Sequence, residues 1–415
     1  DSMRPSAASI RALADSAPRH PLAEPAFRSL WSANIISNVG IWMQTVGGAW
    51  LMTMLTADAL PVALMQTATT LPAFLVGLPA GSLADRVDRR KLLLATQTWV
   101  LGCMALLAVL SLLDLVNPWV LLGLTFAIGA GSTINGPTWA ALLPDIVSRG
   151  QVPTAIIMNS AGFNIARAVG PSIAGFVLGI WGPAATFVLN AAGFGVALGL
   201  VARFLRPRPR PEPKDMEPFA RGMLTGLQYA WRSVPQRIVL GRSVTWMVCA
   251  SALWGLLPLV ARRELGLEAT GYGFLVTCVG AGAVAGSFAL PRLRRRWHVN
   301  ALLLVAIVIF ATMLLVLAWV RWLPPIWAML ALGGAAWTGT NQNFQIAVQM
   351  SAPGYVRARA IATYLLTFQG GLAIGSAIWG AVAERLGAPA ALTIAACGLA
   401  VAFVSAVRWP IEHHS

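Results

Sequence analysis

Apolar residues in this chain gather in blocks of about 20 residues or more, separated by short polar segments. Each block is long enough to cross a hydrocarbon core about 30 Å thick as a helix. The blocks come as a group of six, a charged and proline-rich break, and a second group of six. The pattern therefore predicts an all-α polytopic membrane protein with twelve transmembrane helices. The expected spans are residues 29–55, 60–83, 91–113, 118–140, 154–180, 183–204, 238–261, 270–290, 299–320, 325–348, 358–384 and 388–408.

The two groups of spans also repeat each other in sequence. "AGSLADRVDRRK" at 80–91 aligns with "AGSFALPRLRRR" at 285–296, and the same offset of 205 residues pairs Gly170 with Gly375 and Gly175 with Gly380. One offset held over such a length predicts two pseudo-symmetric six-helix bundles, with a substrate site between them. The expected division is a tail at 1–26, a bundle at 27–204, a linker at 205–236, a bundle at 237–409 and a tail at 410–415.

Composition agrees with the span pattern and orients it. Only 11% of the residues are charged, against about 25% in soluble domains. Of the 30 basic residues, 25 lie on the side of the two termini and four, Arg262, Arg263, Arg321 and Arg385, lie on the other. This asymmetry predicts cytoplasmic termini. It also explains the net charge of +15 as membrane topology, so we expect lipids and no nucleic acid as partners.

A charged motif, "GSLADRVDRRK", stands at 81–91 between the second and third spans. It resembles the signature loop of the major facilitator superfamily, except that Asp88 stands where the usual pattern has glycine. The form "ADRVDRR", with "LPAFLVGLPAG" in span 2 and "NIARAVGP" in span 5, resembles the transmembrane secretion effectors, a branch that includes enterobactin-exporter-like proteins. The resemblance covers the chain from Phe27 to about Pro410. It implies the major facilitator fold and secondary export across the bacterial inner membrane.

The motif predicts a conformational latch on the cytoplasmic side. An acid at a helix end can face the positive N-terminus of a neighbouring helix, which the family architecture would make span 11. Basic residues of the loop can pair with acids or with lipid headgroups. The alternative is that these residues only set topology. The latch is expected to comprise Gly81, Asp85, Arg86, Asp88, Arg89, Arg90, Asp145, Arg357 and Arg359.

A second motif, "AVGPSIAG" in span 5, resembles one found in drug–proton antiporters. Pro171 lacks a backbone donor and invites a bend, while Gly170 and Gly175 permit close helix packing. Ordinary glycine and proline packing is the alternative interpretation.

Arg167 precedes this motif, roughly 18 Å into span 5 at 1.5 Å per residue. An arginine there costs about 2.5–3.5 kcal/mol on insertion scales, so it should face the bundle interior or a wet cavity. It shares a polar helix face with Ser160 and Asn164. Two roles stay open: a fixed positive charge for an anionic substrate, or a clamp on backbone and asparagine oxygens.

Other polar and aromatic residues inside the spans are candidate cavity lining. The resemblance implies that spans 1, 4, 7 and 10 line the cavity, and amide and aromatic side chains suit a large amphipathic substrate. Each of them taken alone is more often helix packing than a ligand contact. The full set of expected substrate contacts is Asn34, Asn38, Trp42, Gln66, Asn135, Trp139, Asn164, Arg167, Trp254, Trp337, Asn341, Gln345 and Gln369.

All 15 acids fall at span ends, in loops or in tails, and none lies at mid-membrane. A proton-coupled antiporter needs a titratable carrier, commonly a carboxylate. Protons as the coupling ion therefore follow from the resemblance alone.

The sequence favours an exporter of small amphipathic molecules, siderophore-like or drug-like, that works by alternating access as a monomer. We expect no enzyme activity, no metal and no cofactor: no Gly-Lys phosphate loop, HExxH or GxSxG is present, and the four cysteines have no metal-ligand spacing. An importer with the same fold, or a membrane receptor or scaffold that does not transport, are the alternatives.

Overall fold

Long helices make up most of the computed structural model, which describes residues 21–205, 228–229, 231–353 and 356–408. For some residues within helices only the backbone is described. The helices are α2 (Pro25–Leu55), α3 (Ala59–Arg86), α4 (Arg89–Leu112), α5 (Pro118–Ile146), α6 (Val152–Phe204), α8 (Val234–Leu259), α9 (Ala269–Arg294), α10 (Val299–Trp319), α11 (Leu323–Ser351), α12 (Arg357–Leu386) and α13 (Ala388–Arg408). Short turns η1 (Pro21–Ala23), η2 (Arg149–Gln151) and η3 (Val260–Glu264) flank α2, α6 and α8.

The helix α6 contains two of the expected spans. Its backbone leaves helical geometry at Gly182, where φ is 78°. That conformation is open to glycine and strained for other residues, and Pro183 then starts the returning helix. Helical backbone continues through Pro171, where a bend stays a prediction, and the break at Gly182 falls between the predicted spans 154–180 and 183–204. With α6 counted as two crossings, the described helices give the twelve predicted spans.

Eight of the described helices are long and apolar enough to cross a membrane by length and composition. Among them is α6, which supplies two crossings. The helices α2 and α11 do not meet the criterion, and the searched part of α13, Ala388–Val401, is apolar but too short for it. Both α2 and α11 interrupt their apolar sequence with amides, such as Asn34 and Asn38 in α2 and Asn341 and Asn343 in α11. A helix that faces a polar interior can carry such residues, whereas one surrounded by lipid is penalised for them.

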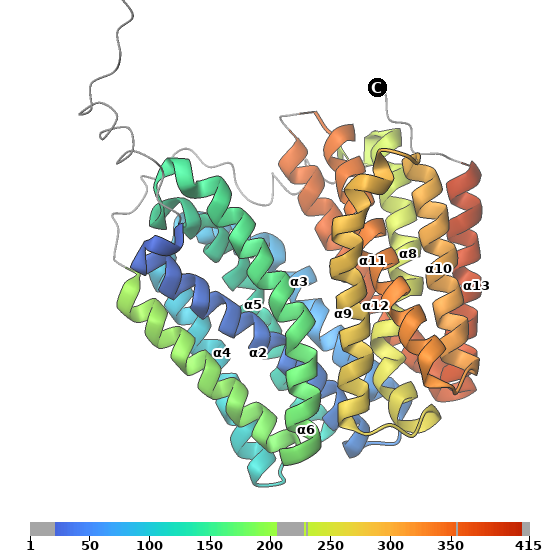
Figure 1. Cartoon of the computed structure of the whole chain (residues 1–415), viewed down its shortest axis with the longest axis horizontal. Helices are drawn as coiled ribbons and strands as arrows, with labels where there is room; N and C mark the ends of the chain where they lie inside the picture. Colours follow the sequence, from blue (N-terminus) through green and yellow to red (C-terminus); the bar gives the residue numbers. More distant parts are fainter. Residues whose placement is uncertain (1–20, 206–227, 230, 354–355, 409–415) are drawn as a thin grey trace, which may run out of the picture.

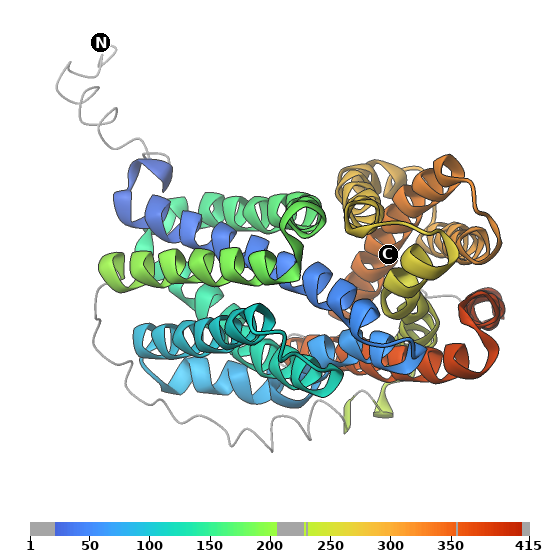
Figure 2. The ribbon, with the colours of Figure 1, turned by 90° about the horizontal axis from the view of Figure 1, so that it is seen from below.

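The helices form two bundles, α2–α6 and α8–α13, which Figures 1 and 2 show as separate groups. Across the boundary α3 packs along α12, and α6 packs along α9. These are the two six-helix bundles that the repeat predicts. We call the end where α2 and α8 begin the linker end, and the end where α2 stops and α3 starts the closed end.

Contacts between the bundles gather toward the closed end. Thr67 Oγ1 donates to the carbonyl of Ala373 at 2.8 Å, and the hydroxyls of Ser172 and Thr277 lie 2.7 Å apart. The largest hydrophobic core joins the C-terminal bundle to the closed-end half of the N-terminal bundle, whereas Leu30 and its neighbours at the linker end form separate clusters. In Figure 1 the bundles diverge toward the linker end. The described structure is therefore shut at one end of the boundary.

Candidate functional site

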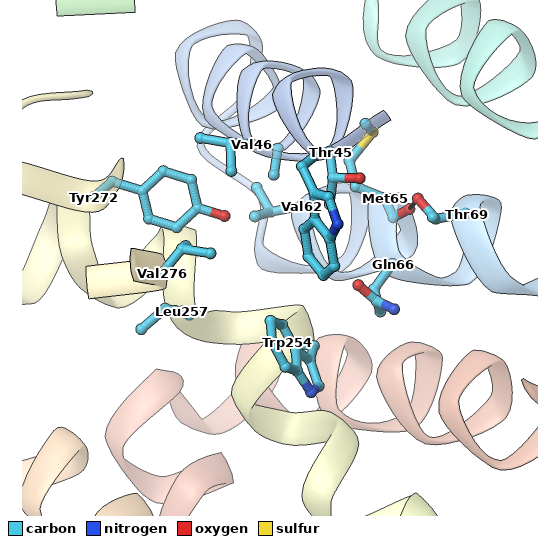
Figure 3. A pocket seen from close by; sticks show the side chains of 12 residues that line it. Thr45, Val46, Val62, Met65, Gln66, Thr69, Trp254, Leu257, Tyr272 and Val276 are labelled. Carbon is cyan, nitrogen blue, oxygen red and sulfur yellow. Dashed lines mark hydrogen bonds between the residues drawn. The ribbon is translucent and has the colours of Figure 1, made fainter. Parts of the chain in front are cut away.

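A small pocket of about 20 Å³ lies between the bundles, lined from α2, α3, α8 and α9. Trp42 and Gln66 line it from the N-terminal bundle, and Trp254 and Tyr272 line it from the C-terminal bundle. In Figure 3 the Tyr272 hydroxyl and the side chains of Gln66 and Trp254 point toward the space between the helices. The indole N–H of Trp254 is buried and has no hydrogen-bond partner in the described protein. The pocket thus combines aromatic surfaces with polar groups from both bundles.

Aromatic and basic side chains seal the pocket toward the closed end. The ring of Tyr272 stacks on Trp50, with centroids 5.7 Å apart. The guanidinium of Arg262 lies 6.0 Å from the Trp50 ring centroid, and its Nη1 donates to Thr53 Oγ1 at 3.3 Å. Because Tyr272 both lines the pocket and carries this stack, pocket and seal share a side chain from the C-terminal bundle.

An aromatic cluster supports the C-terminal wall of the pocket. Trp337 lies at its centre, with ring centroids 5.8 Å from Trp254 and 5.9 Å from Phe368. Trp246 and Phe310 complete the group at 6.4 and 6.1 Å from Trp337. Only 9% of Trp337 is exposed, so its ring holds Trp254 in place, and its own substrate contact stays a prediction.

Amide side chains form a hydrogen-bonded network within the N-terminal bundle. Asn159 Oδ1 accepts hydrogen bonds from Asn34 Nδ2 at 2.6 Å and from Trp139 Nε1 at 3.0 Å. Asn38 Nδ2 donates to Asn34 Oδ1 at 3.0 Å and to the backbone carbonyl oxygen of Asn34 at 2.7 Å. One oxygen of Asn159 therefore links α2, α5 and α6. The sequence did not single out Asn159, which stands one position before Ser160 and therefore outside the polar helix face of Ser160, Asn164 and Arg167.

Arg167 holds an asparagine oxygen. Its Nη2 donates to Asn164 Oδ1 at 3.1 Å, and its buried Nε has no hydrogen-bond partner in the described protein. Asn164 in turn donates to the carbonyl of Ser160 at 3.0 Å. No described carboxylate forms an ion pair with Arg167. The guanidinium of Arg167 is thus held by the Asn164 side chain and has no described carboxylate as an ion-pair partner.

Of the thirteen predicted contacts, only Trp42, Gln66 and Trp254 line the pocket. The six others described above do not, and neither do the remaining four. Asn135 Oδ1 and Asn341 Oδ1 are buried without a described hydrogen-bond partner, and the Asn341 carbonyl accepts from the Tyr364 hydroxyl at 3.1 Å. Gln345 and Gln369 are half-buried in α11 and α12. Their contacts with substrate stay predictions.

The structure describes the charged motif in part. Asp88 N-caps α4, accepting from the backbone N–H of Arg90 at 2.8 Å and of Lys91 at 3.2 Å. Arg90 Nη2 donates to the carbonyl of Ala202 at 3.3 Å, within the same bundle, and Arg357 Nε donates to that of Ala352 at 3.4 Å.

Other members of the expected latch are described less fully. Arg89 and Arg359 also have interaction partners. Gly81, Asp85, Arg86 and Asp145 lie outside the residues whose side chains are described, so the cytoplasmic latch stays a prediction.

The glycines of the second motif face two different neighbours. A Cβ added to Gly170 would lie 2.6 Å from the Cβ of Trp42, in the same bundle. One added to Gly175 would lie 2.9 Å from the Cα of Gly273, in the opposite bundle. Gly170 thus permits packing inside a bundle, and Gly175 permits contact between bundles.

Two further charged features lie outside the pocket lining. Every described acid lies at or near a helix end, as the sequence predicts; Asp58 and Glu268, for example, are N-cap residues. Arg242, counted from sequence with the linker-side charges, lies eight residues into α8 and is 6% exposed. The sequence pattern could not show that Arg242 is buried, because the predicted span began at residue 238 and Arg242 therefore lay near its boundary.

Comparisons with known proteins agree with this architecture. The chain is 22% identical to the staphyloferrin A transporter of Staphylococcus aureus over 63% of this chain and 66% of that protein. It is 24% identical to the multidrug efflux pump Tap of Mycolicibacterium fortuitum over 79% of this chain and 82% of the pump. It is 28% identical to the enterobactin exporter EntS of Escherichia coli over 68% and 67% of the two chains.

Solved structures share the fold at low identity. A point mutant of the nucleoside transporter NupG superposes with a TM-score of 0.73 at 14% identity, over 92% of this chain and 99% of that one. A bacterial homologue of the lysosomal transporter Spinster, inward-facing and unoccupied, gives 0.72 at 14% over 94% and 99%. The family model of the transmembrane secretion effectors matches residues 16–414. Together with the two-bundle fold, this match shows that the chain belongs to the transmembrane secretion effectors of the major facilitator superfamily.

Proposed function

We propose that this chain exports small amphipathic molecules, siderophore-like or drug-like, across the bacterial inner membrane by alternating access. The observation that carries the proposal is that the two bundles pack together at one end, where Trp50, Tyr272 and Arg262 meet, and diverge toward the other end. A site shared by two bundles that meet at one end can be exposed to each side in turn when the bundles rock.

The lining supports an amphipathic substrate. Indole rings of Trp42 and Trp254 offer stacking surfaces, and the amide of Gln66 offers a donor and an acceptor. Arg167 lies outside the pocket lining, but it is a positive charge within the span with no described acid beside it, which favours a substrate with an anionic group. The names of the relatives, two siderophore transporters and a drug efflux pump, agree with this chemistry.

The linker end is proposed to face the cytoplasm, because basic residues are concentrated there. The described state would then face inward, and the motif at 81–91 would latch the linker end when the closed end opens. The bundles at 27–204 and 237–409, the cytoplasmic linker at 205–236 and a monomeric working state belong to the same proposal. Proton coupling is proposed from the family resemblance alone, since no described acid lies inside the membrane span.

The test measures uptake into inside-out membrane vesicles that contain the chain, with enterobactin, staphyloferrin A and ethidium as probes. An exporter loads these vesicles when an ion gradient is imposed, and Arg167→Ala lowers loading of the anionic probes more than that of ethidium. Loading of right-side-out vesicles alone would identify an importer. If no probe from a wider amphipathic panel enters either type of vesicle, the transport proposal fails.

A further inference from the structure

The N-terminus of α3 is capped by a side chain from the opposite bundle. Glu384, near the end of α12, accepts hydrogen bonds through Oε2 from the backbone N–H of Ala59 at 2.5 Å and of Leu60 at 3.1 Å. The local N-cap residue, Asp58, makes no side-chain capping bond. The first two N–H groups of α3 therefore depend on the C-terminal bundle for their acceptor.

The contact combines three favourable terms. A helix begins with four backbone N–H groups that have no partner within the helix, and a carboxylate also interacts with the positive end of the helix dipole. Hydrogen bonds to an ionised acceptor are stronger than neutral ones. All three terms exist only while α3 and α12 stay together at the closed end.

Close packing fixes the position of Glu384. One turn earlier in α12, a Cβ added to Gly380 would lie 2.6 Å from the Cβ of Ala63 and 3.3 Å from the Cα of Leu60. The absence of a side chain at Gly380 brings the backbones together and places the next turn of α12 beside the start of α3. The glycine at position 380 thus positions the Glu384 carboxylate to cap α3.

The equivalent helix crossing in the repeat is built differently. The offset of 205 residues pairs Glu384 with Gly179 of α6. There a Cβ added to Gly179 would lie 2.5 Å from Thr270 Cγ2, near the start of α9. One crossing between the bundles thus ends in small-residue packing, and the other ends in a charged cap. The carboxylate is not required by the fold as such, because the symmetric crossing forms without one.

We propose that Glu384 is a latch residue of the closed end, which sets the balance between the closed state and the state open at that end. It acts across the bundle boundary by capping α3, and it releases α3 when the bundles separate. The inference rests on the alternating-access mechanism proposed above. It assigns the closed end a charge–helix contact like the one that the signature loop predicts for the linker end.

The test compares Glu384→Ala, Glu384→Gln and the control Glu268→Ala. Glu268 is also an acid at the closed end and precedes α9, but it makes no side-chain capping bond. Spin labels at Leu115 and Trp322, exposed positions of the two bundles, report the distance across the closed end. The four native cysteines are replaced by alanine in all variants.

Removing a capping acceptor shifts such a balance about fivefold to tenfold. We expect Glu384→Ala to raise the long-distance population by that factor. Glu384→Gln should raise it less, because its amide oxygen still accepts hydrogen bonds while the charge is lost, and it serves if the alanine variant does not fold. An unchanged distribution in both variants, or an equal shift in Glu268→Ala, would overturn the proposal. The measurement uses no substrate, so a population shift without any vesicle transport would refute the proposed function and leave the latch standing.

Discussion

Gly273 offers a quantitative test of how the bundles close. A Cβ added to it would lie 2.7 Å from the Cα of Gly175, 2.8 Å from the carbonyl oxygen of Pro171 and 3.1 Å from the backbone nitrogen of Gly175. Ordinary van der Waals contacts of a Cβ lie between 3.4 and 4 Å. All three neighbours are backbone atoms, so no side chain can turn away. With Gly273→Ala, α6 and α9 must separate by about 0.7 Å where they cross.

The size of the effect follows from overpacking. Inserting a methyl group into a close-packed site costs about 1–3 kcal/mol, and each 1.4 kcal/mol changes an equilibrium about tenfold. Because the clash exists only when the closed end is shut, Gly273→Ala should favour opening there by about fivefold to a hundredfold. Export should fall, since the state that loads from the linker end becomes rarer.

The assay combines the spin-label distance between positions 115 and 322 with uptake into inside-out vesicles. Gly195→Ala is the matched control, because it lies on α6 and a Cβ there meets nothing within 4 Å. Both substitutions gain the same helix propensity, about 1 kcal/mol in favour of alanine, so their difference isolates the contact. If Gly273→Ala matches Gly195→Ala in both measurements, the close approach of α6 and α9 does not control closure and the reasoning fails.

Three further outcomes are expected. Arg167→Lys should retain part of the transport of an anionic probe. Arg167→Gln should lower that transport at least about tenfold, since a charged hydrogen bond contributes about 1.5–3 kcal/mol. Equal transport by both variants would show that the charge of Arg167 takes no part in binding the probe. Asn159→Leu should lower the melting temperature, because the donors of Asn34 and Trp139 lose their acceptor at about 1–3 kcal/mol each; an unchanged melting temperature would mean that water replaces Asn159. Asp88→Ala should destabilise the protein by about 1 kcal/mol and Asp88→Asn by much less, and a transport defect shared by both variants at normal stability would assign Asp88 to the latch instead of the cap.

Several elements follow from the sequence because their causes are local. Apolar blocks longer than the membrane core predict helices, and the observed α10 at Val299–Trp319 lies within one residue of the predicted 299–320. Gly182 and Pro183 mark the break between two spans, since glycine tolerates positive φ and proline suits the first turn of a helix. The repeat at an offset of 205 residues predicts two bundles, and the match to the secretion effectors confirms the family.

The sequence predicted some features of the candidate site and could not predict others. Helical spacing placed Asn34 and Asn38 on one face, and the structure joins them by a hydrogen bond. Spacing within one helix could not find Asn159, whose role depends on where α2 and α5 meet α6. Nor could it show that Trp337 lies among aromatic side chains while Trp254 borders the pocket, because both are tryptophans in polar-faced spans.

The sequence by itself determined the number of helices, their order, the twofold repeat and the lack of an acid inside the membrane span. These properties depend on hydropathy and composition along the chain. Only the tertiary structure decided which end of the bundle boundary is shut, that Arg167 holds Asn164, and that Glu384 caps a helix 325 residues away. The physical reason is that a contact between helices depends on their rotation and approach, which side chains from several helices set together.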